Sequence, residues 1–234
     1  ARCSVPVLEM PRKDAPLVTE VVAGERLEVV GSRSGWLEVV VPSHASHLDP
    51  RGYPGWVRDD AVLDLDAWSP DLKVVRENGA GLPLGALLES RGAGARLPDG
   101  RVVGLPADAV RPVGEPDGRS AVEISGSFLG LPYRWGGTDS TTGMDCSGMV
   151  FRVMQLCGFD VPRDADDQYE RAPFKSREGW GDARAGDLVF FGEGSITHVG
   201  FYLGDGSYVS EHGSGGTVVR GVTEDPYWGF ARYG

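Results

Sequence analysis

The stretch TTGMDCSGMVFRVMQLCGF, from Thr141 to Phe159, decides the fold of the second half of the chain. Its apolar residues recur at the spacing of one helix face: Val150, Val153, Met154 and Cys157. Asp145 is a residue type that caps helix N-termini, and Gly158 suits the position just after a helix. The pattern therefore predicts a helix that begins near Cys146 and ends before Gly158.

Cys146 lies in the first turn of this predicted helix, where free N–H groups and the helix dipole favour a negative charge. The position predicts a stabilised thiolate with a low pKa, and the small Ser147 and Gly148 leave room for a substrate. A buried structural cysteine is the alternative, and it suits Cys157 on the apolar stripe better. From position alone, both interpretations of Cys146 stay open.

Composition limits the classes of function. The chain has 234 residues, three cysteines and a net charge of −11. An acidic chain is a poor partner for nucleic acid, and no run approaches the ~20 apolar residues of a membrane span. Three cysteines do not make a disulfide framework. Neither a metal nor a cofactor is implied.

The first half reads as two small β domains. RLEVVG and WLEVVV resemble short strands, and WVRDDAV (residues 56–62) has a weak echo in GLPADAV (residues 104–110). PVGEPDG, residues 112–118, is a Pro/Gly linker. We expect domains at residues 1–64, 65–115 and 116–234.

After the linker, the pattern predicts an α+β domain. A helix up to Gly130 and the Cys146 helix precede three strands, GDLVFF, THVGFYLG and SYVSEHG. The sequence GDG between the last two strands predicts a hairpin.

Four histidines are candidates for a base beside Cys146. His44 and His47 lie in a polar loop, and we expect them to be solvated rather than metal ligands. His198 begins a strand, and a cysteine at a helix start facing a strand histidine is a Cys–His catalytic arrangement. If residues 204–206 form the loop, Leu203 pairs with Ser207 and His198 comes opposite His212. His212 is then the favoured orienting residue, with Ser210 as the alternative.

The motifs PYRWGGTDSTTGMDCSGMV, PRDADDQ, AGDLVFF and HVGFYLGDG together resemble those of the NlpC-type cell-wall cysteine peptidases. The resemblance covers roughly residues 120–234. It implies a papain-like fold that cuts peptides of peptidoglycan, with Cys146 as nucleophile and His198 as base. The family's third residue, often histidine, lies twelve positions after the base, which is Ser210 here, whereas His212 lies fourteen after.

The first half is similar to bacterial SH3-like domains. Two of them ahead of such a catalytic domain resemble the branch that hydrolyses γ-D-glutamyl–diamino-acid bonds in murein peptides with a free L-Ala amine. That resemblance implies a substrate-binding set of Tyr53, Asp145, Ser147, Asp164 and, more weakly, Glu20. Asp164 would supply a carboxylate for the ammonium group of L-Ala.

The fold expected is thus an α+β papain-like cysteine peptidase domain preceded by two small all-β SH3-like barrels. The expected partners are peptidoglycan-derived peptides. A general peptidoglycan hydrolase or amidase that uses the SH3-like domains for wall binding is the alternative function. The preferred diamino acid, the oligomeric state and the location, in the bacterial cytoplasm or the cell envelope, stay open.

Overall fold

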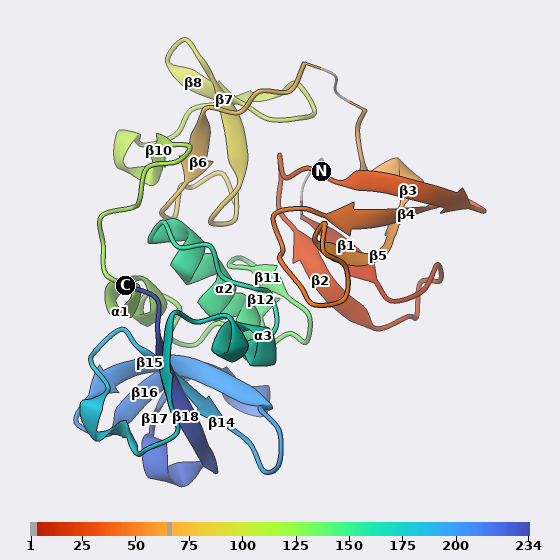
Figure 1. Cartoon of the computed structure of the whole chain (residues 1–234). Helices are drawn as coiled ribbons and strands as arrows, with labels where there is room; N and C mark the ends of the chain where they lie inside the picture. Colours follow the sequence, from red (N-terminus) through yellow and green to blue (C-terminus); the bar gives the residue numbers. More distant parts are fainter. Residues whose placement is uncertain (1–3, 65–66) are drawn as a thin grey trace. The chain divides into compact units, whose positions relative to one another are not determined.

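The computed structural model describes residues 4–64 and 67–234 (Figure 1). The chain divides into two compact units, which are described separately. The first unit contains the residues up to Asp117 together with Trp135–Thr141, and the second contains Gly118–Arg134 and Thr142–Gly234. Residue 65, where the second predicted domain begins, lies outside the described residues.

The first sheet of the first unit has five antiparallel strands in the order β2-β1-β5-β4-β3. The strands are β1 Val5–Leu8, β2 Leu17–Val21, β3 Glu28–Arg33, β4 Trp36–Val41 and β5 Tyr53–Arg58. Its core is made largely of valines, which suit a pleated surface. The 3₁₀ turn η1 (Asp59–Ala61) follows β5.

The second sheet also has five strands, in the order β10-β6-β7-β8-β9. They are β6 Leu72–Val74, β7 Leu87–Arg91, β8 Gly94–Arg96, β9 Val102–Val103 and β10 Val110–Pro112. The 3₁₀ turn η2 (Ala107–Ala109) precedes β10, so both halves of the predicted sequence echo contain a 3₁₀ turn. The predicted domain limits stay predictions.

Residues 135–141 lie in the second half of the sequence, but they belong to the first structural unit. This segment contains β11 (Thr138–Asp139). Thr138 Oγ1 donates to the carbonyl oxygen of Glu20 at 2.6 Å, and Ser140 Oγ accepts from the N–H of Leu84 at 2.9 Å. These bonds attach the segment to β2 and to the loop before β7.

The second unit is an α+β domain with a six-stranded antiparallel sheet in the order β13-β18-β14-β15-β16-β17. The strands are β13 Phe174–Ser176, β14 Leu188–Phe191, β15 His198–Gly204, β16 Ser207–His212, β17 Gly216–Gly221 and β18 Tyr227–Arg232. The three strands predicted from the sequence are confirmed as β14, β15 and β16.

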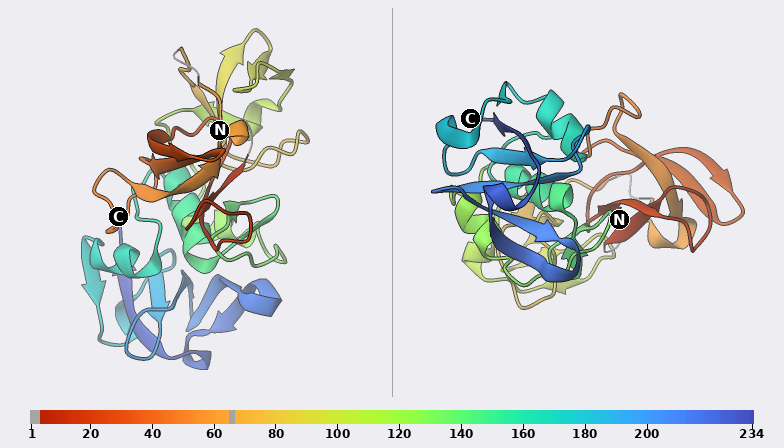
Figure 2. Two further views of the ribbon diagram at one scale, coloured as in Figure 1. Left: turned by 90° about the vertical axis from the view of Figure 1, so that its right-hand side faces the viewer. Right: turned by 90° about the horizontal axis from the view of Figure 1, so that it is seen from below.

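Three helices accompany this sheet: α1 Ala121–Gly126, α2 Cys146–Leu156 and α3 Ala165–Glu170. The short strand β12 (Gly143–Met144) precedes α2, and the 3₁₀ turns are η3 Trp180–Asp182, η4 Gly213–Gly215 and η5 Val222–Glu224. α1 and α2 pack against β15 and β16 (Figures 1 and 2). No helix in the described part of the chain is long and apolar enough to span a bilayer.

Strand β14 explains the uninterrupted apolar run LVFF, because all four of its side chains are buried. Val189 and Phe191 belong to a cluster with Tyr208 and Phe230 on one face. Phe190, on the other face, packs edge-on against Tyr169 of α3 with ring centroids 5.1 Å apart. A strand that is covered on both faces needs no polar alternation.

Helix α2 confirms the bounds predicted from the opening stretch. The Asp145 side chain caps it by accepting from the N–H of Gly148, and Gly158 beyond its end has φ 89°. Cys157 is the half-buried C-cap rather than a core residue, and its Sγ lies 3.8 Å from the carbonyl oxygen of Arg119.

The β15–β16 hairpin differs from the prediction by one residue at its tip. Gly204, not Leu203, pairs with Ser207, so that the loop is Asp205-Gly206. Both loop residues have positive φ, as a type I′ turn requires. A bulge between Tyr202 and Gly204 absorbs the difference, and the predicted register holds for the pairs Phe201–Val209 and Tyr202–Tyr208.

Candidate active site

Cys146 opens α2 with its thiol buried. Burial, reinforced by the charge of Asp145, raises the pKa of Cys146 to about 12, whereas the backbone N–H groups of Val199 and Ser147 act in the opposite direction. The predicted low-pKa thiolate is therefore wrong for the free enzyme. The helix-start position is as expected, but desolvation of the thiolate outweighs the favourable helix end.

A buried polar network surrounds the start of α2. Asp145 Oδ1 accepts from the N–H of Gly148 at 2.6 Å, and its Oδ2 accepts from the Arg163 guanidinium at 2.8 Å. The same guanidinium donates to Ser147 Oγ at 2.8 Å, and the Gln168 amide donates to the Ser147 carbonyl oxygen at 3.0 Å. The predicted residues Asp145 and Ser147 thus lie together beside the nucleophile.

Arg163 and Gln168 were not singled out from the sequence. Both belong to the quoted motif PRDADDQ, which was the available signal. Arg163 is only 1% exposed, so its buried positive charge is compensated by the Asp145 carboxylate rather than by water.

His198 opens β15, next to Val199, whose N–H faces the thiol. Its Nε2 lies 3.1 Å from Nε2 of His212. Burial and, to a lesser degree, His212 lower the pKa of His198 to about 4, so the imidazole is neutral at neutral pH. Burial also lowers the pKa of His212.

The structure separates the two candidates for the orienting residue. Ser210 Oγ is fully buried and donates to the carbonyl oxygen of Val199 at 2.5 Å. His212 contacts His198 and also lies 3.0 Å from the Tyr208 hydroxyl, which donates to Asp225 at 2.5 Å. Tyr208 and Asp225 had no sequence signal, because strand alternation does not identify a partner seventeen residues away.

Two further titratable groups interact with Asp145 beside the nucleophile. Tyr133, from the PYRWGG motif, has a pKa raised to about 12 by burial and by the charges of Cys146 and Asp145. Glu211 is fully buried, and Thr217 Oγ1 donates to its Oε1. Its Oε2 has no hydrogen-bond partner among the residues that the structure describes. Burial raises the pKa of Glu211 to about 7, and Asp145 adds to the rise.

The remaining predicted substrate residues lie elsewhere. Asp164 is the half-buried N-cap residue of α3 but makes no side-chain cap bond. Tyr53 begins β5 within the valine-rich core, and Glu20 is a buried residue of β2. Tyr53 and Glu20 belong to the first unit and Asp164 to the second, so their common role stays a prediction.

His44 corrects a sequence-based expectation. It is completely buried, not solvated, with Nδ1 2.8 Å from Thr19 Oγ1 and Nε2 3.4 Å from Glu25 Oε1. The polar loop after β4 folds inward at this residue, whereas His47 is exposed as expected.

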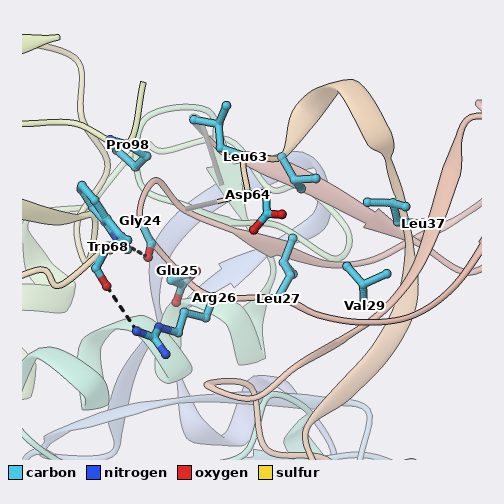
Figure 3. A pocket seen from close by; sticks show the side chains of 11 residues that line it. Gly24, Glu25, Arg26, Leu27, Val29, Leu37, Leu63, Asp64, Trp68 and Pro98 are labelled. Atoms are coloured by element: carbon cyan, nitrogen blue, oxygen red, sulfur yellow. Dashed lines mark hydrogen bonds between the residues drawn. The ribbon is translucent and has the colours of Figure 1, made fainter. Parts of the chain in front are cut away.

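The first unit has a cavity of its own, of about 630 Å³ (Figure 3). Its wall is mixed: Leu27, Val29 and Leu37 are apolar, whereas Arg26 and Asp64 carry charges. Trp68 is fixed there, because its indole N–H donates to the Gly24 carbonyl oxygen at 3.1 Å and its own carbonyl oxygen accepts from Arg26 at 3.2 Å.

The fold and the cysteine–histidine site define a papain-like α+β chain, and comparison with known proteins agrees. The NlpC/P60 family model matches residues 130–232. The γ-D-glutamyl-L-lysine dipeptidyl-peptidase of Bacillus subtilis (strain 168) is 33% identical over 92% of this chain and 79% of its own length. This chain belongs to the NlpC/P60 family.

Two other relatives extend the match beyond the catalytic region. A protein of the same name from Bacillus cereus is 26% identical over 82% of this chain and 66% of its own length. The crystal structure of an NlpC/P60 family protein from Bacillus cereus superposes with a TM-score of 0.86 at 21% identity, covering 98% of this chain and 97% of that one. The papain-like NlpC/P60 fold predicted from the sequence is confirmed.

Proposed function

We propose that this protein is a cysteine endopeptidase that hydrolyses the γ-D-glutamyl–diamino-acid bond of murein peptides with a free N-terminal L-Ala. The observation that carries the proposal is Cys146 at the start of α2, with the N–H of Val199 at its sulfur and His198 next in the chain. The similarity to the Bacillus subtilis dipeptidyl-peptidase, which includes the first unit, supports the substrate class.

The geometry supports a reaction that starts from a neutral pair. The thiol is protonated and the His198 imidazole is unprotonated at neutral pH, because burial disfavours both charged forms. His198 takes the thiol proton as sulfur attacks the γ-carbonyl carbon, and it then donates that proton to the leaving amine. Water hydrolyses the thioester that is left, again with His198 as base.

The polar groups at the start of α2 are suited to stabilise the negative charge that develops on the substrate. Backbone N–H groups of the first helical turn are suited to stabilise the oxyanion of the tetrahedral intermediate. Asp145 and Arg163 hold that turn through their ion pair at 2.8 Å. Both five-stranded sheets of the first unit are proposed to be SH3-like domains. Asp164 is proposed to bind the ammonium group, and Tyr53 and Glu20 are proposed as further substrate-binding residues.

Mass spectrometry of the products from an L-Ala-γ-D-Glu-diamino-acid peptide tests the proposal. We expect L-Ala-γ-D-Glu and the free diamino acid from the wild type and from Cys157→Ser, whose cysteine lies at the other end of α2. Cys146→Ala should form no product. Hydrolysis by Cys146→Ala at a rate near that of the wild type contradicts the mechanism.

A general peptidoglycan hydrolase or amidase is the second candidate, since the cavity of the first unit could serve wall binding. It predicts cleavage of intact, sugar-linked stem peptides, or release of L-Ala from muramic acid. The same mass spectra distinguish these products from the dipeptide.

A further inference from the structure

The hydrogen bond between Nε2 of His198 and Nε2 of His212 departs from in-plane geometry. Their ring centroids are 4.2 Å apart, and the ring planes are tilted by 46°. An in-plane N–H···N bond of ~3 Å would hold two imidazole centroids roughly 5 Å apart. The His198 ring therefore lies partly over the His212 ring.

His212 Nε2 has a second polar partner besides His198, the Tyr208 hydroxyl. Tyr208 lies four residues earlier on β16, is fully buried, and has its hydroxyl oxygen 3.0 Å from His212 Nε2. The single hydroxyl proton of Tyr208 is donated to Asp225 Oδ2. The phenol oxygen is thereby held in a fixed position beside His212 Nε2.

We propose that Tyr208 and Asp225 are positioning residues of the catalytic site, which act through His212 on His198. Asp225, at the end of η5, accepts a hydrogen bond from the Tyr208 hydroxyl. The Tyr208 oxygen contacts His212 Nε2, and the same nitrogen contacts His198. This rests on the proposed function, because it treats His198 as the base.

The array of Asp225, Tyr208 and His212 adds a carboxylate, that of Asp225, to the catalytic cysteine and histidines. When His198 takes the thiol proton it becomes a cation, and Asp225 is the carboxylate whose charge favours the protonated forms of both histidines. Glu224 also favours the protonated form of His212, whereas Arg220, 3.6 Å from Asp225 Oδ2, opposes protonation of both. Burial and the bond to Asp225 raise the pKa of Tyr208, so the phenol stays protonated.

The test uses the full chain with Tyr208→Phe, Asp225→Asn and the double variant. Asp205→Asn is the matched control, because it removes a carboxylate from the turn of the same hairpin at a residue where asparagine tolerates positive φ. We expect each single variant to lower kcat roughly tenfold with little change in KM, as for loss of one charge-assisted hydrogen bond. The double variant should lose no more than the worse single variant, because both act through one chain.

Ring ¹⁵N NMR at neutral pH supplies a readout that needs no substrate. The wild type should show one predominant His212 tautomer, because Tyr208 and His198 both contact Nε2. Tyr208→Phe should give a mixture of tautomers, with a Tm that shows a folded protein. An unchanged His212 tautomer in Tyr208→Phe, or a kcat of Asp225→Asn equal to that of Asp205→Asn, overturns the inference. If the tautomer shifts but no γ-glutamyl bond is cut by the wild type, the proposed function fails and the array stands.

Discussion

At the scale of single residues, the sequence indicated the candidate reactive residues, but it did not predict their protonation states. Cys146 and His198 could be predicted because the chain has only three cysteines and four histidines, and one of each begins a regular element. The pKa of Cys146 was predicted in the wrong direction, because helix-end electrostatics is local whereas burial depends on the packed fold. Arg163 and Tyr208 were missed for the same reason, since their partners are distant in sequence.

The two candidates for the orienting residue should fail in different ways. His212→Ala is expected to lower kcat by ~10²-fold, by analogy with the loss of other triad orienting groups. Ser210→Ala removes a buried hydrogen bond to Val199 and should cost about 1 kcal/mol of unfolding free energy with much less effect on kcat. Steady-state kinetics and urea unfolding on both variants separate the roles, and a larger kcat loss for Ser210→Ala would favour the family spacing instead.

Glu211 predicts an unusual pH dependence of stability. Its pKa is about 7 in the folded protein and near 4.5 when exposed, so the folded state binds its proton more tightly. The stability it contributes is complete below pH 4.5 and is lost as the pH rises through 7. The loss amounts to about 3 kcal/mol at most.

Glu211→Gln, an imitation of the protonated acid, isolates this effect. The wild type should lose stability between pH 5 and pH 8 relative to the variant. His198, whose pKa is lowered to about 4, contributes in the opposite sense, because its stability is lost as the pH falls from 6.5 through 4. That contribution is the same in both proteins and cancels in the difference of their urea unfolding free energies. Parallel curves for the two proteins would contradict the prediction.

At the scale of elements, local patterns were reliable and long-range pairing was not. The caps and period of α2 fixed its bounds, and alternation with a Gly-Asp-Gly turn fixed the β15–β16 register apart from a bulge. Strands β13, β17 and β18 were not predicted, because they are short or rich in glycine and gain their place by pairing with the central strands. His44 shows the same limit, since only the folded loop reveals its burial.

The two helix caps of the second unit should differ in strength. Ser120→Ala removes the exposed capping box of α1 and should cost about 1 kcal/mol. Asp145→Ala removes a cap and also leaves the buried Arg163 without its carboxylate, so the expected cost is about 3 kcal/mol or more. Urea unfolding of both variants measures the difference, and equal costs would mean that Arg163 finds another partner.

At the scale of the whole molecule, the proposed selectivity depends on the free amine of the substrate. N-acetylation of L-Ala removes the positive charge that Asp164 would bind and adds bulk. Loss of one charge-assisted contact costs roughly 1.5–3 kcal/mol, or ten- to hundred-fold in kcat/KM. Asp164→Asn should therefore weaken kcat/KM for the free peptide and narrow its advantage over the acetylated one.

The exposed Asp166 provides the control for that experiment, because Asp166→Asn removes a charge two residues along α3. It should leave the ratio of the two peptides unchanged. Equal rates of the wild-type enzyme on free and acetylated peptides would leave a general wall hydrolase as the better description.

The attachment of residues 135–141 to the first unit bears on how such a protein can evolve. Thr138 and Ser140 hold partners on the first unit, yet they are encoded between two parts of the catalytic unit. A recombination event in the linker around Asp117 would replace the first half of the protein. Thr138 and Ser140 would then be retained, although their hydrogen-bond partners in the original first half would be lost. Exchange of front modules in this lineage would thus require compensating substitutions within 135–141, and the two halves are expected to be inherited together.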